Sequence, residues 1–521
     1  MTAETGRVFA RFFRFLFPQP GPAPIRPMRV VSAQRTLVTS TRLSLIAFTL
    51  LALLIRLPLL GLPAFQSDEQ FYLLVGQRMS EGAIPFVDIW DRKPIGLFLI
   101  YRAFFGIPID PVIGYQLAGL VFSVATALVI ERAARLIAPA SGARLAGIAY
   151  LLYQAVFNVE LGQSPVFYNL LVALAGLWTV RMCMHSRDRY LSLRGIGVML
   201  LLGLAIQIKY TVIFEGIAMG LMLLARGKDD GWSVSRLICV CAVWIGFALL
   251  PTGLALLAYT RAGYGDAFIQ ANFLSIFDRR TDHLHAFVNL GKEVLAMLPF
   301  LLAVLHAPRH FHRRGGSAPG ALAPIRAWAI AAVFGFLIMG TWYDHYLGPV
   351  LVPLSILSAP ALALASGRGP WYRRLLLGLG IVGAVTVPAF QLREKGNAAQ
   401  FALVSNRIAQ NLHGRCLYVY DGDTALYRTT QACIPTRFAY PSHLNAMNEA
   451  HAIGIDPVRE VARIMETRPG VVVMREDARP NLANTATARL MAAQLARSYE
   501  RYAEAKLGTR RYALYRLRPQ A

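Results

Sequence analysis

Charged residues are scarce in this sequence. Only 16% of the 521 residues are Asp, Glu, Lys or Arg, while 55% are hydrophobic. This shortage excludes an ordinary soluble protein and is typical of a polytopic membrane protein. Acidic residues are the scarcer sign, with 29 against 53 basic residues. The basic residues stand in short clusters between apolar segments, so we interpret them as topology signals and expect no nucleic-acid partner.

The sequence also lacks several motifs, and each absence restricts its function. It has no glycine-rich phosphate loop for a nucleotide sugar, and no internal repeats of the kind found in many transporters. The histidines of "HAPRHFHRR" have no cysteine or carboxylate among them, so we predict no metal site there. Cysteines number only five. Cys416 and Cys433 can form a disulfide in an oxidising compartment, but the sequence leaves their pairing open.

Apolar segments long enough to cross a membrane recur from Leu45 to Phe390. Each can span a hydrocarbon core of about 30 Å at ~1.5 Å per residue. The positive-inside rule places the N-terminal segment and five clusters of Arg and Lys in the cytoplasm, so two crossings must separate each cluster from the next. This predicts eleven crossings and a C-terminus outside. The expected spans are 45–62, 112–131, 145–159, 165–183, 195–209, 211–225, 237–259, 287–306, 327–342, 347–366 and 375–391.

The apolar segment Ile95–Ile107 is too short for a further crossing, because as a helix it reaches only about 20 Å. We expect a helix that lies at, or dips into, the outer membrane surface. It belongs to a predicted outer loop, 62–111. Arg56, inside the first span, is costly in lipid unless it snorkels or faces protein.

The sequence changes character near residue 392, where charged residues become frequent. Alternating helical and β-type stretches predict a small external α/β domain over 392–521. The expected β-type runs are 416–420, 471–474 and 510–517, and a helix is expected over 456–468. The predicted fold is therefore a cytoplasmic segment 1–42, an all-α polytopic membrane domain over 43–391 with outer-surface helices, and this external domain.

Two adjacent carboxylates, Asp68 and Glu69, follow the first span in "FQSDEQFYLLVG". One interpretation is structural. Ser67 and Gln70 form a capping-box pattern, and acids in the first turn of a helix interact favourably with its macrodipole. The other interpretation is catalytic, and the rest of the outer loop supports it.

The stretch "PFVDIWDRKPIG" places Arg92 and Lys93 at the lipid boundary, just before the short apolar helix. A cation at this place can bind an anionic headgroup while the apolar tail of the lipid stays in the bilayer. The loop therefore suits a lipid-phosphate substrate.

The order of first span, Asp-Glu pair, surface helix, Lys-Pro and apolar helix resembles the multi-spanning C-type glycosyltransferases of family 39. This family includes bacterial relatives of protein O-mannosyltransferases and the lipid A aminoarabinose transferases. The stretches "LYRTTQACIPTRFAYPSHL" and "DHYLGPVLVP" also look like bacterial members. The resemblance covers most of the chain, but its specific motif lies within residues 60–110.

The resemblance implies roles for residues of the outer segments. Asp68 and Glu69 match the family's Asp-Glu pair; Asp68 is the expected base, and Glu69 shapes the site or helps to bind an ion. Lys93 matches the lysine that meets the carrier phosphate, although the family's Lys-Pro-Pro reads Lys93-Pro94-Ile95 here. Glu160 is the nearest candidate for a further acid in the second external turn.

Other candidates lie at the outer ends of spans. Lys209 resembles a lysine that the family has at this place, or it is a snorkelling lysine. Arg279 and Arg280 suit a phosphate, or they form a solvated loop face. His345, beside Tyr346 in "WYDHYLGP", is a second choice for stabilising the leaving group, or a structural histidine.

These residues predict a glycosyltransferase of the inner membrane with a periplasmic C-terminus. It would move a sugar from a polyprenyl-phosphate donor to a glycan, lipid or protein acceptor of the cell envelope, on the outer side. The sequence does not decide on a cofactor, and a divalent cation near Asp68 and Glu69 is one option. A transporter or flippase of lipid-linked glycans is the alternative, since eleven spans fit it too.

Overall fold

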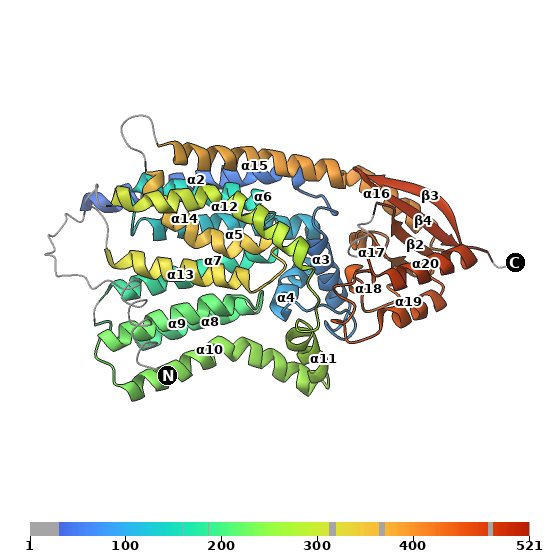
Figure 1. Ribbon diagram of the computed structural model, residues 1–521, viewed down its shortest axis with the longest axis horizontal. Coiled ribbons are helices and arrows are strands. Elements are labelled where there is room, and N and C mark those ends of the chain that lie inside the picture. Colours follow the sequence, from blue (N-terminus) through green and yellow to red (C-terminus); the bar gives the residue numbers. More distant parts are fainter. Residues whose placement is uncertain are drawn as a thin grey trace.

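The computed structural model describes residues 31–159, 161–185, 187–311, 319–363, 370–477 and 483–519. Figure 1 shows a bundle of long helices and, at one end of it, a smaller C-terminal part that contains the strands. The helices α3 (Ser67–Ser80) and α4 (Ile95–Ala103) lie between these two parts. Residues of the outer loop therefore contact both the bundle and the C-terminal part.

Within the described residues, a helix of the bundle lies at each of the eleven predicted spans. Eight of the described helices are long and apolar enough to cross a membrane. Among the others, α6 and α8 have 17 and 16 residues, and α9 carries charged residues at its end. Eleven crossings therefore stay a prediction. The bundle helices are α2 (Val31–Arg56), α5 (Pro111–Ala134), α6 (Ala140–Val156), α7 (Ser164–Met184), α8 (Leu191–Ile206), α9 (Val212–Asp229), α10 (Val234–Arg261), α12 (His283–Phe311), α13 (Pro319–Leu337), α14 (Gly348–Leu362) and α15 (Trp371–Lys395).

The short apolar helix expected in the outer loop is present as α4. Its nine residues reach about 14 Å at ~1.5 Å per residue, which is far too short for a crossing. Helix α4 packs closely against α3, where Gly76 allows the contact: a Cβ atom at this position would lie 2.8 Å from the backbone nitrogen of Arg102. The close packing fixes α3 against the end of the bundle.

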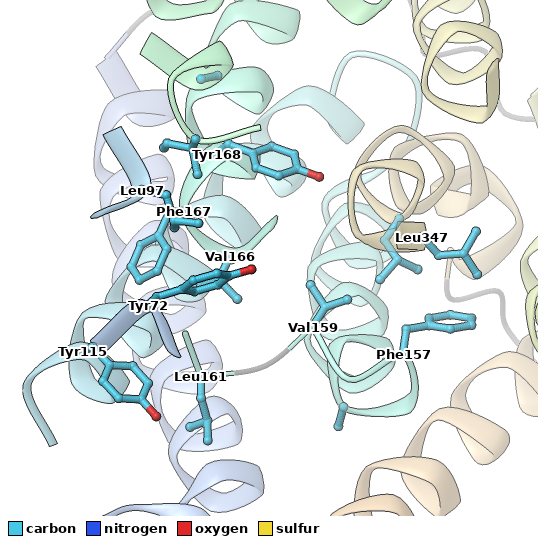
Figure 2. Close-up of a cluster of buried hydrophobic side chains, with 14 of the residues drawn as sticks. Tyr72, Leu97, Tyr115, Phe157, Val159, Leu161, Val166, Phe167, Tyr168 and Leu347 are labelled. Atoms are coloured by element: carbon cyan, nitrogen blue, oxygen red, sulfur yellow. The ribbon is translucent and has the colours of Figure 1, made fainter. Parts of the chain in front are cut away.

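Buried side chains fill the space below α3. Figure 2 shows Tyr72 of α3 among Leu97 of α4, Tyr115 of α5 and Phe167 of α7. The Tyr72 and Tyr101 rings lie edge to face with centroids 5.5 Å apart. Because aromatic rings bury large apolar areas, this cluster holds the outer loop on the bundle.

Arg56 faces protein, which is one of the two alternatives that the sequence leaves open. The side chain is fully buried, and its Nη2 donates hydrogen bonds to Ser123 Oγ at 3.0 Å and to Gln154 Oε1 at 2.8 Å. A buried charge is tolerated when such partners replace its water.

The C-terminal part contains a four-stranded sheet in the order β1-β2-β4-β3. Strand β1 is parallel to β2, and the other two pairs are antiparallel. Strands β1, β2 and β4 lie at the predicted β-type runs, but β3 was not predicted. It is a polar edge strand with an irregular register between Arg501 and Ala503. The elements are α16 (Ala398–Ala409), β1 (Leu417–Val419), α17 (Ala425–Thr429), α18 (Ser442–Asn445), α19 (Pro457–Glu466), β2 (Val471–Arg475), α20 (Thr485–Ser498), β3 (Tyr499–Leu507) and β4 (Arg510–Leu517).

A disulfide joins Cys416 to Cys433, which settles the pairing that the sequence left open. It closes the segment between β1 and the stretch that follows α17. That stretch runs back towards the outer loop, where the backbone N–H of Trp90 donates to the carbonyl of Arg437 at 2.8 Å.

Candidate active site

Helix α3 positions Asp68 in its first turn, but the capping-box interpretation of this turn is wrong. Helix α3 begins at Ser67, and its N-cap residue, Gln66, makes no side-chain capping bond. Gln70 reaches instead into the C-terminal part, where its Nε2 donates to Asp423 Oδ1 at 3.1 Å and its Oε1 accepts from the Ala425 N–H at 3.2 Å. Tertiary contacts thus hold this helix end.

Asp68 is half-buried and surrounded by donors and cations. The hydroxyls of Tyr72 and Tyr440 donate to its two oxygens at 3.3 and 3.2 Å. Burial acts to raise the pKa of Asp68, but the electrostatic interactions with Lys93, His345 and Lys209 outweigh it and lower the pKa below its usual value. The carboxylate is therefore ionised at neutral pH.

Lys93 comes from the loop between α3 and α4. Its Nζ lies 5.6 Å from the centroid of the Tyr72 ring, so the side chain reaches the surroundings of Asp68. Burial acts to lower the pKa of Lys93, but the carboxylates of Asp91 and Asp68 outweigh it and raise the pKa. Lys93 is therefore a charged ammonium group at neutral pH.

Lys209 joins the same group of side chains from the turn between α8 and α9. Its Nζ lies 4.7 Å from the ring centroid of Tyr346. Burial and the nearby charge of Lys93 lower the pKa of Lys209 to about 7. The charge of Lys209 therefore changes near neutral pH.

His345 and Tyr346 approach from the turn before α14. The Nδ1 atom of His345 lies 3.2 Å from Asp344 Oδ1, and the side-chain amide of Asn158 donates to Asp344 in turn. The His345 ring packs edge to face on Tyr346 with centroids 4.6 Å apart. These contacts fix the imidazole near Asp68.

Two of the three predicted arginines, Arg92 and Arg279, share one acid, Glu449. The Nη1 of Arg92 donates to Glu449 Oε1 at 3.0 Å, and the Nε of Arg279 lies 2.9 Å from the same oxygen. Burial acts to raise the pKa of Glu449, but the two guanidinium groups lower it to about 2. Arg280 stands apart: its side chain is exposed, and its backbone N–H donates to the carbonyl of Asn448 at 3.2 Å.

Glu69 has different surroundings from Asp68. It is fully buried, and it interacts with the hydroxyl of Tyr115 and lies near Tyr101 and Lys395. Glu160, the further acid suggested by the sequence, lies outside the described residues.

The described residues contain no group of three or more His, Cys, Asp or Glu side chains placed to hold a metal ion. The Asp68 carboxylate already faces cationic side chains, and Glu69 does not share its surroundings. We derive no step through a metal.

Sequence reasoning missed the contributions of the C-terminal part. Tyr440 donates to Asp68, and Glu449 neutralises two arginines. His443 is wedged against the Trp90 ring with centroids 4.7 Å apart, and burial lowers its pKa to about 3. The only sequence signal was the resemblance of the stretch "LYRTTQACIPTRFAYPSHL", which contains two of these residues.

The fold is similar to those of solved C-type glycosyltransferases, as the resemblance predicted. A scan against protein-family models and a search of curated proteins gave no match. Among solved structures, apo ArnT from Cupriavidus metallidurans has a TM-score of 0.60 at 17% identity, over 93% of this chain and 98% of ArnT. ArnT bound to undecaprenyl phosphate has a TM-score of 0.56 at 16% identity, over 92% and 98% of the two chains. The chain therefore has the fold of ArnT.

Proposed function

We propose that the protein transfers a sugar from a polyprenyl-phosphate carrier to an acceptor of the cell envelope. One observation carries this proposal: an ionised carboxylate, Asp68, faces the cations Lys93 and Lys209 at the end of a helix bundle. The fold of ArnT, which has been seen with undecaprenyl phosphate, supports a lipid-phosphate partner.

In this proposal Asp68 is the general base. It takes the proton of an acceptor hydroxyl, whose oxygen attacks the anomeric carbon of the donor. The bond from this carbon to the phosphate oxygen breaks, its electron pair stays on the phosphate, and free polyprenyl phosphate leaves. A single displacement of this kind inverts the anomeric configuration. The hydrogen bonds from Tyr72 and Tyr440 orient the carboxylate for this role.

Lys93 is the proposed partner of the carrier phosphate. It is charged at neutral pH and lies close to Asp68, so it can stabilise the negative charge that develops on the leaving group. Lys209, His345 and Tyr346 complete the surroundings of the leaving group. Arg279 is held by Glu449 and adds positive charge from the adjacent loop.

The proposal places the reaction on the outer side of the inner membrane, with the C-terminal part in the periplasm. The arginine clusters support this orientation through the positive-inside rule. A reporter that is active only outside the cytoplasm, fused after Arg393, is expected to be active. Activity of a strictly cytoplasmic reporter at this position would overturn the orientation.

Purified protein, a radiolabelled polyprenyl-phosphate sugar and a crude outer-envelope extract test the proposed reaction. The expected products are free polyprenyl phosphate and labelled acceptor, and the labelled fraction identifies the acceptor as glycan, lipid or protein. Asp68→Asn protein is the control for background hydrolysis. In sealed vesicles, movement of the labelled lipid across the membrane without any transfer would support a flippase and overturn the transferase.

A further inference from the structure

A cavity lies beside the site, between the outer loop and the C-terminal part. Its volume is about 490 Å³, within the range of roughly 300–1,000 Å³ that is usual for small-molecule sites. Asp88 and Ile89 of the outer loop form one side, and Arg437, Phe438 and α19 form the other. None of these residues belongs to the proposed reaction.

The cavity combines apolar and planar polar side chains. Ile434 and Ile455, which are partly exposed, supply apolar surface, while the polar groups include donors and acceptors of hydrogen bonds. Glu460 accepts from Thr436 Oγ1 at 2.6 Å and from the Nε of Arg463 at 2.8 Å, which holds its carboxylate in place. Vicinal hydroxyl groups on an apolar ring face, as in a sugar, match this mixture.

Within the described residues, two charged groups of the cavity form no ion pair: Arg437 and Asp88, whose carboxylate accepts a hydrogen bond from the Ile84 N–H at 2.7 Å. Arg463 pairs with Glu460, and Arg78 pairs with Glu81 at 2.5 Å. Arg437 lies with its guanidinium carbon 4.9 Å from the ring centroid of Phe438, and within the described ranges no carboxylate forms an ion pair with it. A guanidinium group of this kind favours a phosphate or carboxylate.

The cavity and Asp68 lie on opposite sides of one wall. The wall is formed where Trp90 bonds to the backbone of Arg437, and the Trp90 ring packs on Phe438 at 5.6 Å and on His443 at 4.7 Å. Tyr440, three residues before His443, donates to Asp68. A molecule held in the cavity is therefore positioned next to the chain segments that carry the reacting groups.

We propose that this cavity binds an anionic sugar, bearing a phosphate or a carboxylate, that forms part of the acceptor. The inference rests on the proposed function, because it assigns the acceptor of the same reaction. Arg437 binds the anionic group, and Ile434 and Ile455 support the ring. The acceptor extends past the wall so that its reactive hydroxyl reaches Asp68. Binding of this remote part orients the acceptor for the transfer.

Transfer kinetics give the first test, with Arg437→Ala as the main variant. The half-saturating amount of envelope extract should rise about 5- to 10-fold, at the lower end of a charge-assisted contact because Arg437 is exposed. The half-saturating donor concentration should stay unchanged, and Arg437→Lys should restore part of the loss. Arg459→Ala is the matched control, because Arg459 is 90% exposed on α19 and does not line the cavity. Equal effects of both alanine variants would overturn the proposal.

Direct binding gives a test that does not require transfer. Glucose 6-phosphate and glucose are the probes, with full-length protein in nanodiscs and saturation-transfer NMR as the readout. Glucose 6-phosphate should bind more strongly than glucose to the wild type and to Lys93→Met, but the difference should disappear in Arg437→Ala. The proposed site would be wrong if glucose 6-phosphate did not bind to the wild type. It would also be wrong if binding were lost in Lys93→Met but kept in Arg437→Ala. Retained cavity binding without any sugar transfer would instead count against the proposed reaction.

Discussion

Two faces of helix α3 carry neighbouring carboxylates with different surroundings. On one face, Asp68 is half-buried among Lys93, Lys209 and His345. On the other, Glu69 is fully buried and interacts with the Tyr115 hydroxyl. Successive helix residues point about 100° apart, so one turn can present one acid to a reaction and the next to the core. The chemistry of each acid follows from its face of the helix.

Neutralising Asp68 and Glu69 in separate variants should give the largest difference between the two faces of α3. Asp68→Asn should lower turnover by about 100-fold or more, the usual scale for losing a general base. Glu69→Gln should change turnover by only a few fold, because the amide keeps the shape and a hydrogen-bonding oxygen. The measurement is label transfer by each variant after a check of its thermal unfolding. Similar turnover in both variants would remove the catalytic assignment of Asp68.

Removing a cation from the Asp68 face should have the next largest effect. In Lys93→Met most of the aliphatic stem stays, but a charge-assisted contact of roughly 1.5–3 kcal/mol is lost. Donor affinity or turnover should fall by about 10- to 150-fold, since each 1.4 kcal/mol is a factor of ten. Lys93→Arg should restore part of this loss.

The control for that experiment is Lys506→Met, because Lys506 is exposed on the edge strand β3. Donor titrations of both methionine variants separate the site from general effects of lost charge. Unchanged transfer in Lys93→Met would assign the phosphate to Arg279 or His345 instead.

The pH dependence of donor binding tests whether Lys209, on the Asp68 face, contacts the donor. Lys209, with a pKa of about 7, is positive below this pH and neutral above it. The phosphodiester of the donor keeps its negative charge throughout this range, so donor affinity should fall about 3- to 10-fold between pH 6 and 8. Lys209→Gln should bind with little pH dependence, as measured by donor titration at each pH.

Unfolding does not explain such a fall in affinity. The pKa of Lys209 is below its usual value of 10.5, so between about pH 7 and 10.5 the unfolded chain binds more protons at this residue than the native chain. The contribution of Lys209 to the free energy of unfolding therefore rises with pH, opposite to the expected donor affinity. A parallel loss of stability and affinity would contradict this account.

The smallest expected effect is a gain. Glu449 binds Arg279, so Glu449→Gln should free this guanidinium group for the carrier phosphate. Donor affinity should rise about 3- to 10-fold, because a larger fraction of the protein is then ready to bind. Glu466→Gln, at an exposed position of α19, is the matched control in the same donor titration. Weaker binding in Glu449→Gln would mean that the acid only holds the loop in shape.

Much of the fold could be predicted from the sequence, because hydropathy and charge clusters act locally. Helices lie at all eleven predicted positions, α4 is short as expected, and strands β1, β2 and β4 match predicted β-type runs. Strand β3 was missed because its alternation of Tyr499, Ala505 and Leu507 is diluted by charged residues. The placement of Asp68 near Lys93 follows from their shared outer loop.

The rest of the site depends on contacts between distant parts of the chain. Tyr440 and Asp68 are 372 residues apart, and no local pattern around either one indicates the hydrogen bond between them. The same holds for Glu449, which lies 357 residues after Arg92. The capping-box pattern was wrong for this reason: a distant acid, Asp423, competes for the side chain of Gln70.

The hydrogen bonds that Gln70 makes to Asp423 and Ala425 have a consequence for how this protein can change in evolution. A domain that only touches a membrane part can be exchanged, shortened or fused as a module. Here the C-terminal part holds α3, the helix that carries Asp68. A different C-terminal part would have to supply hydrogen-bond partners for the side-chain amide of Gln70 and for the carboxylate of Asp68. A chimera of distant relatives joined near Lys395 is therefore expected to lose the alignment of α3 even if both halves fold.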